Sequence, residues 1–238
     1  DFLLTLQDDM EITEPGWDIR LTYPLRQFEN VLAATGRSAQ DIAGLDGYGR
    51  LIYRNQAARE RFSLPRGTFA VRDVINRGPI AFDAAKLRAL DFLNEAYAPS
   101  DLDDADLCLR AFEQHGWMSG AFWIDYISRP EWSKKKQHDS TMGASMSESK
   151  NAQRIMRDHA GYFQSGKKHS VTVRLAENEI DYPAGFNRRA LRASIARSQV
   201  RFISARPTAI TKRFVMGKVQ GIRRAVKRVG NIRIQSAF

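Results

Sequence analysis

Hydrophobic and polar positions alternate with short periods in the first quarter of the chain. Residues 19–23 switch between apolar and polar side chains, which predicts a short strand, and the mainly apolar stretch that follows, residues 25–34, predicts a short helix. Residues 44–55 predict a β-hairpin, because Asp46-Gly47 is a turn pair between two runs of alternating polarity.

The next hundred residues favour helices. A short helix is predicted at 56–62, and residues 82–97 carry apolar positions at helical spacing. Residues 101–115 predict a further helix, with Ser100 as its N-cap and Gly116 as its stop signal.

The pattern changes at Ser133. Residues 133–149 have almost no apolar bulk, which predicts a flexible loop or linker. Helical and strand periods return after it and continue to the C-terminus. The predicted elements are a helix at 152–159, a strand at 170–175, a helix at 186–196, a strand at 199–203, a helix at 215–229 and a strand at 232–235.

These patterns predict an α+β protein in two parts. Residues 1–132 would form an acidic, mainly helical part with a protein-contact role, and residues 133–150 a flexible basic linker or loop. Residues 151–238 would form a basic α/β part, possibly ferredoxin-like, that binds nucleic acid.

Charge is divided unevenly between the two parts. The whole chain has a formal net charge of +10, but residues 1–131 hold 14 Lys and Arg against 21 Asp and Glu. Residues 182–238 hold 14 Lys and Arg and no acidic residue. A folded surface normally intersperses both signs, so 57 residues without one carboxylate predict an acidic partner.

Nucleic acid is the partner that this basic region favours. A phosphate backbone rewards aligned cations through counterion release, and eleven of the 14 cations are Arg, which can grip phosphate with two hydrogen bonds. Interleaved phenylalanines favour unpaired RNA over duplex DNA. The predicted contacts are Lys134, Lys135, Lys136, Arg188, Arg189, Arg192, Arg197, Arg201, Lys212, Arg213, Lys218, Arg223, Arg224, Lys227, Arg228 and Arg233.

Other interpretations of the basic region stay open. It could face an acidic protein or a membrane surface, or be a solvated face. We expect no membrane partner, because the longest apolar runs fall far short of the roughly 20 residues that span a bilayer. A single cysteine, Cys108, excludes an intrachain disulfide and indicates the cytoplasm or another reducing compartment.

Catalytic and metal-binding chemistry has little support. No histidine pair has metal-ligand spacing, and no cofactor motif occurs, so no metal and no cofactor are expected. The acidic run at 101–106 lacks the glycine and the distal glutamate of a calcium loop. His138, beside Asp139, is a weak candidate for acid–base catalysis.

The function expected from the sequence is a non-catalytic, RNA-binding subunit of a larger nucleoprotein assembly. One alternative is a metal-independent RNA-processing nuclease that uses His138, and another is a structural protein of a virion or ribosome-like particle. Residues 215–234 loosely resemble the ferredoxin-like end of RNA-binding CRISPR effector subunits, where a helix leads through a glycine into a basic strand. The glycine-rich loop of those subunits is absent, and the chain is assigned to no family.

Overall fold

The chain divides into two compact units, Asp1–Arg188 and Arg189–Phe238. It is mixed α+β, as the sequence predicts. The second unit is described over residues 189–205 alone. The structure is a computed structural model that describes residues 1–58, 63–98, 102–129, 141–166 and 169–205, with the backbone alone for 141–149 and 197–205.

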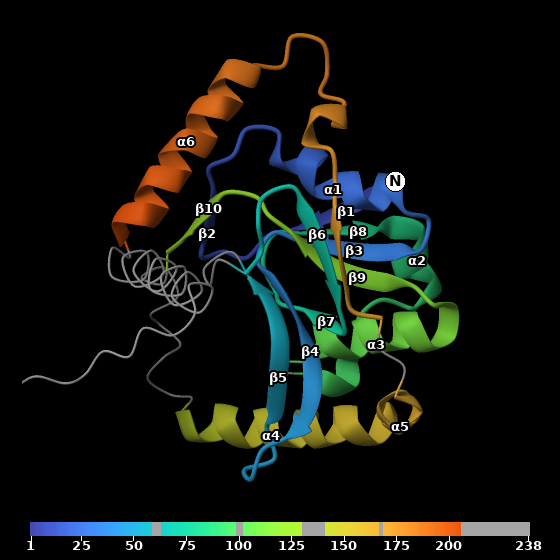
Figure 1. Cartoon of the computed structure of the whole chain (residues 1–238). Coiled ribbons are helices and arrows are strands. Elements are labelled where there is room, and N and C mark those ends of the chain that lie inside the picture. The colour runs from blue at the N-terminus through green and yellow to red at the C-terminus, as the bar shows by residue number, and fades with distance from the viewer. Residues whose placement is uncertain (59–62, 99–101, 130–140, 167–168, 206–238) are drawn as a thin grey trace, which may run out of the picture. The chain divides into compact units, whose positions relative to one another are not determined.

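The first unit is built on a mixed β-sheet. The strands of this unit, counting those of two smaller sheets, are β1 (Phe2–Thr5), β2 (Met10–Ile12), β3 (Val31–Thr35), β4 (Ser38–Leu45), β5 (Leu51–Ala58), β6 (Thr68–Arg72), β7 (Val74–Ile75), β8 (Ile80–Asp83), β9 (Met118–Phe122), β10 (Tyr126–Ser128) and β11 (Val171–Arg174). The main sheet has the order β1-β8-β3-β9-β6-β11, and smaller sheets have the orders β5-β4-β7 and β10-β2 (Figure 1). β3 and β9 are parallel, and the other neighbours in the main sheet are antiparallel.

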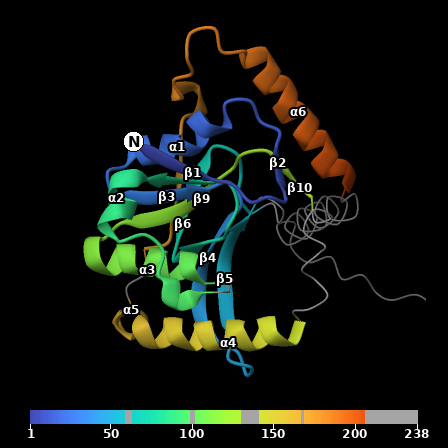
Figure 2. The same cartoon turned by 180° about the vertical axis from the view of Figure 1, so that it is seen from behind.

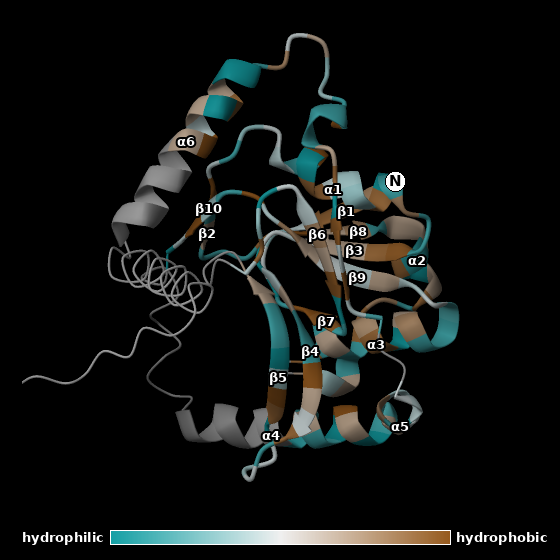
Figure 3. Cartoon of the chain, in the orientation of Figure 1, coloured by the Kyte–Doolittle hydropathy of each residue, from teal (hydrophilic) through white to brown (hydrophobic). Residues whose placement is uncertain are grey.

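Helices cover both faces of this sheet. The helices of the first unit are α1 (Trp17–Gln27), α2 (Ala84–Ala89), α3 (Asp103–His115), α4 (Thr141–Asp158) and α5 (Ala160–Ser165), with 3-10 turns η2 (Glu95–Tyr97) and η4 (Glu177–Glu179). Helix α6 (Arg188–Ala205) begins at the last residue of the first unit and belongs otherwise to the second. α1 packs on β3 and β8 at one face, and α3 packs on β7 and β9 at the other (Figure 2). β3, at the centre of the sheet, and its neighbour β8 contribute mainly apolar, buried residues to the core (Figure 3).

The N-terminal part is not mainly helical, since it contains strands β1 to β10. Two of its short segments also have the opposite structure to the one predicted. Residues 19–23 belong to α1, in which Arg20 to Leu25 are all buried, so their alternation does not mark one exposed face. Residues 31–35 form β3, which is buried on both faces. A strand of that kind has a continuous apolar sequence that periodicity cannot distinguish from a buried helix.

Two further predicted helices do not form as predicted. The predicted helix at 56–62 is replaced, in its described part, by the end of β5 at Ala58. The predicted helix at 82–97 is reduced to α2 and η2. Asp83 caps α2 by accepting hydrogen bonds from the amides of Ala85 and Lys86.

The hairpin, the helix before Gly116 and the strand at 171–174 are confirmed. Residues 141–150 of the predicted linker are helical in α4, and residues 199–203 are helical in α6 rather than a strand. Residues 188–205 contain neither Gly nor Pro and are rich in Ala and Arg, which favours one uninterrupted helix over a break at residue 197.

The division into units falls at residue 188 rather than in the predicted linker. β11 pairs with β6 over Val171–Arg174, so the chain after the linker completes the sheet of the N-terminal part. The change of composition at Ser133 therefore lies inside the first unit.

A buried ionic cluster joins distant segments of the first unit. The Glu14 carboxylate is 3.3 Å from the Arg20 guanidinium and 2.5 Å from that of Arg66, and it accepts a hydrogen bond of 2.8 Å from the amide of Asp125. Glu177 of η4 pairs with both arginines. Arg20 also donates to the carbonyl of Trp123 and lies over the ring of Phe122 at 4.7 Å. The cluster connects α1, the turn before β6, the β9–β10 segment and η4.

Replacing Arg20 by Met should destabilise the fold strongly. The Arg20 and Glu14 side chains are 1% and 0% exposed, so the substitution leaves Glu14 buried with one cation fewer. Removing one partner of such a buried pair costs about 3–5 kcal/mol of unfolding free energy. Urea unfolding followed by circular dichroism measures the loss.

The matched control is Arg129→Met, which breaks the Arg129–Glu11 pair, whose side chains are 37% and 44% exposed. An exposed pair contributes about 0–1 kcal/mol, so this variant should unfold almost as the wild type does. Equal effects of the two substitutions would show that the buried cluster is not a main stabilising feature.

Candidate nucleic-acid interface

Helix α6 begins with an exposed group of arginines. Arg188, Arg189 and Arg192 are exposed, and their spacing of three and four residues places them along one side of the helix. Leu191 and Ser194 occupy a different side and are buried. The guanidinium of Arg188 lies 5.4 Å from the centre of the Tyr182 ring. The basic region thus starts as an ordered helix that presents guanidinium groups to solvent.

The position of these arginines is unfavourable for the helix itself. Arg188 and Arg189 are in the first turn, which contains no acidic residue. The N-terminal end of a helix carries partial positive charge, so a cation there costs a few tenths of a kcal/mol up to about 1 kcal/mol. Helix stability therefore does not explain why two arginines occupy this turn.

The other predicted contacts are not brought together by the described structure. Arg197 and Arg201 belong to α6, but their side chains lie outside the described part. The remaining residues and the catalytic candidate also lie outside it: Lys134, Lys135, Lys136, His138, Lys212, Arg213, Lys218, Arg223, Arg224, Lys227, Arg228 and Arg233.

A second group of cations and aromatic rings, absent from the predicted set, lies on the β4–β5 hairpin. Tyr48 is 81% exposed and Tyr53 is 38% exposed. Arg54 is also exposed, and the Arg50 side chain is 44% exposed. The signal in the sequence is the repeat of Tyr and Arg around the Asp-Gly turn, which contains no cluster of lysines and arginines.

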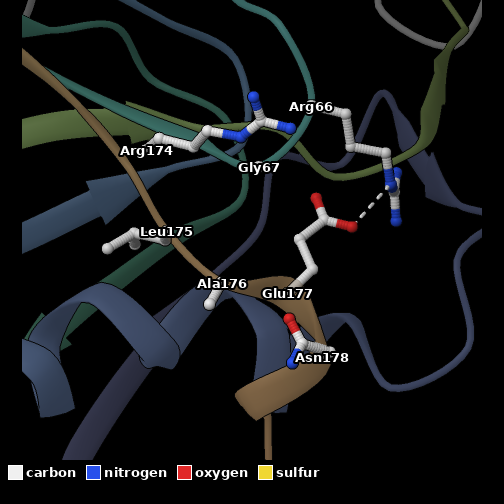
Figure 4. A pocket seen from close by; sticks show the side chains of 7 residues that line it. All are labelled: Arg66, Gly67, Arg174, Leu175, Ala176, Glu177 and Asn178. Atoms are coloured by element: carbon white, nitrogen blue, oxygen red, sulfur yellow. Dashed lines mark ion pairs between the residues drawn. The ribbon is translucent and has the colours of Figure 1, made fainter.

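A pocket of about 590 Å³ lies where the β11–η4 segment crosses the turn before β6 (Figure 4). Arg66 reaches into its wall and is paired there with Glu177, and Arg174 lies on the opposite side. Glu14 and Asp125 also contact Arg66, so this guanidinium is balanced by carboxylates. The pocket contains none of the predicted nucleic-acid contacts. Its lining residues are Arg66, Gly67, Arg174, Leu175, Ala176, Glu177 and Asn178.

Two histidines of the described part are held in buried networks. His159 contacts the Glu113 carboxylate at 2.5 Å and the Asp106 carboxylate at 3.2 Å. Burial alone would lower the pKa of His159, but these two hydrogen bonds outweigh it and raise the pKa above its usual value. This arrangement joins the end of α4 to α3 and has no access to a substrate.

His169 belongs to a network around two buried aspartates. Its ring stacks on Phe112 at 4.0 Å, and Nδ1 is 3.4 Å from the Tyr162 hydroxyl, which donates to Asp73. Burial lowers the pKa of His169. Stacked on Phe112 and half-buried, this imidazole has a packing role.

Metal and thiol chemistry find no site in the described residues. No group of three or more His, Cys, Asp or Glu side chains there could hold a metal ion. Asp103, Asp104 and Asp106 lie in the first turn of α3, where negative charge stabilises the helix by interacting with its dipole. Cys108 is buried and burial raises its pKa to about 12, so the thiol is inert. Among the described helices, none has the length and apolar character needed to cross a bilayer.

The His159 pair should make stability depend on pH. Because folding raises the pKa of His159, its contribution is complete below the unfolded value of about 6.5 and disappears as pH rises through the folded value. The stability difference between wild type and His159→Gln should therefore be largest near pH 6 and shrink toward pH 9. Thermal unfolding of both proteins across that range measures it, and a difference that grows with pH would contradict the assignment.

Comparison with known proteins gives no relative. No family model matches the chain, and neither a curated protein nor a solved structure is similar to it. The functional conclusion therefore depends on the chemistry of the chain itself.

Proposed function

We propose that this protein is a non-catalytic subunit of a nucleoprotein assembly that binds RNA through its basic C-terminal region. The observation that carries the proposal is the stretch from Tyr182 to Phe238, which holds 14 Lys and Arg and no carboxylate. A phosphate backbone is the partner for which such a stretch gains most, through release of condensed counterions. The exposed arginines at the start of α6 support it.

Some of the acidic residues of the N-terminal part are not available as intramolecular partners of the basic region. Five of its carboxylates are at most 5% exposed and are engaged by buried hydrogen bonds or ion pairs. Their charge is not presented to a basic surface. These residues are Glu14, Asp41, Asp73, Asp106 and Asp125.

The N-terminal part is proposed to contact protein neighbours in the assembly. β1 is an edge strand of the main sheet, and it exposes Phe2, Leu3 and Leu4 by 36%, 44% and 37%. Consecutive exposed apolar side chains on a sheet edge favour association with another chain.

Binding should depend steeply on salt, through the arginines of the basic region. Each phosphate contact adds roughly 0.7–0.9 to the slope of log affinity against log salt. Replacing Arg223 and Arg224 by Ala should weaken binding of most RNA sequences alike and reduce the slope by about 1–2 if both touch phosphate. Fluorescence anisotropy with a labelled mixed-sequence RNA at several salt concentrations measures both quantities.

Arg88→Ala is the matched control, because Arg88 is an exposed arginine of α2 outside the basic region. It should leave the slope unchanged. A folded double-Ala variant with wild-type affinity and slope would remove these two residues from the interface. Cleavage of the RNA in the presence of a chelator, lost in His138→Ala, would replace the proposal by the nuclease alternative.

A further inference from the structure

The β4–β5 hairpin is anchored at its base and exposed at its tip. Asp41, which is 3% exposed, accepts hydrogen bonds from Asn55 at 2.8 Å and Ser170 at 2.5 Å. Leu45 and Leu51 pack against the core nearer the turn. Beyond these contacts the turn projects past α4 in both views (Figures 1 and 2). The hairpin is therefore an arm with a fixed base.

The turn at the tip is held in one conformation by Asp46. Its Oδ1 accepts hydrogen bonds of 2.9 Å from the amides of Tyr48 and Arg50, and its Oδ2 pairs with the Arg50 guanidinium at 3.1 Å. The hydrogen bond from the Arg50 amide, with those from Tyr48 and the guanidinium, lowers the pKa of Asp46. Tyr48 is thus presented on an ordered turn, with its ring 81% exposed.

The side chains exposed on this arm combine aromatic rings with planar cations. The guanidinium of Arg50 lies 5.3 Å from the centre of the Tyr48 ring. Tyr53 and Arg54 follow on β5, where residues 52–55 are all exposed. The carboxylate at the tip, Asp46, is already engaged by the turn. Rings and guanidinium planes stack on unpaired bases, and Arg also attracts phosphate.

We propose that the β4–β5 hairpin is a second RNA contact, at which Tyr48 in the turn and Tyr53 on the exposed part of β5 stack on unpaired bases. This inference rests on the proposed function and adds to it. The basic C-terminal region would supply charge-driven, salt-dependent contacts, whereas the hairpin would supply stacking that requires single-stranded RNA. Exposed Tyr and Arg also occur at protein interfaces. Among the described residues of the hairpin, however, Ile52 is the one large aliphatic side chain that is exposed, which favours RNA over a protein partner.

The test compares the RNA affinity of two variants of the full chain, one without the two tyrosine rings and one that keeps aromatic rings at both positions. The double variant Tyr48→Ala/Tyr53→Ala removes both rings, and Tyr48→Phe/Tyr53→Phe keeps them. Loss of stacking should weaken binding of single-stranded RNA roughly ten-fold or more, because each stacked base contributes appreciably to affinity. The salt slope should stay at the wild-type value, and duplex binding should change little. The Phe variant should bind as the wild type does.

Photocrosslinking gives a second readout that does not depend on affinity. RNA containing 4-thiouridine should crosslink to residues 46–54 in the wild type, and mass spectrometry identifies the attached peptide. Thermal unfolding confirms that both variants remain folded, as exposed positions predict.

Three results would overturn the inference. Wild-type RNA affinity in the Ala variant together with no crosslink to the hairpin would exclude the contact while leaving the proposed function intact. Conversion of a wild-type dimer to a monomer by the Ala variant, with RNA affinity unchanged, would identify the hairpin as an interface between copies of this chain. Absence of any RNA binding by the wild type would reject this inference and the proposed function together.

Discussion

The buried ionic cluster around Glu14 and Arg20 is the constraint on which the first unit depends. Glu14, Arg20 and Asp125 are almost wholly shielded from water, which is costly unless each finds a partner, and the partners come from widely separated parts of the sequence. Arg20 and Glu177 are 157 residues apart along the chain. Their pairing joins η4 to α1, next to the strand β11 that completes the main sheet. The fold of the first unit is therefore complete only when the chain includes β11 and η4, which come shortly before α6.

This closure changes the meaning of the charge division in the sequence. The carboxylates of the N-terminal part are numerous partly because several serve as buried partners for arginines and amides. The basic region begins at Tyr182, shortly before the first unit ends at Arg188, and its first arginines occupy the N-terminal end of α6, which disfavours cations. Internal pairing accounts for several of the acidic residues, and the proposed function gives the basic region a partner outside the first unit.

Local signals predicted some elements well. The Asp46-Gly47 turn produced the expected hairpin, and Gly116 ends α3 with a positive φ of 68°. Prediction failed where tertiary packing decides the structure. α1 is buried around Arg20, whose partners cannot be inferred from neighbouring residues, and β3 is apolar throughout because both of its faces are covered. Of the candidate site, the exposed arginines of α6 were predicted, but the hairpin tip was not, since its exposure is a property of the fold.

The measurement that tests the central claim most directly is the affinity of the wild-type chain for a labelled single-stranded RNA as a function of salt, beside a labelled polyglutamate of equal charge. The account predicts clear RNA binding at low salt, a slope equivalent to several phosphate contacts at roughly 0.7 each, and much weaker binding of the peptide. Absence of RNA binding would contradict the proposed function. Binding of the acidic peptide as tightly as the RNA would also contradict it, and would identify the basic region as a surface for acidic proteins.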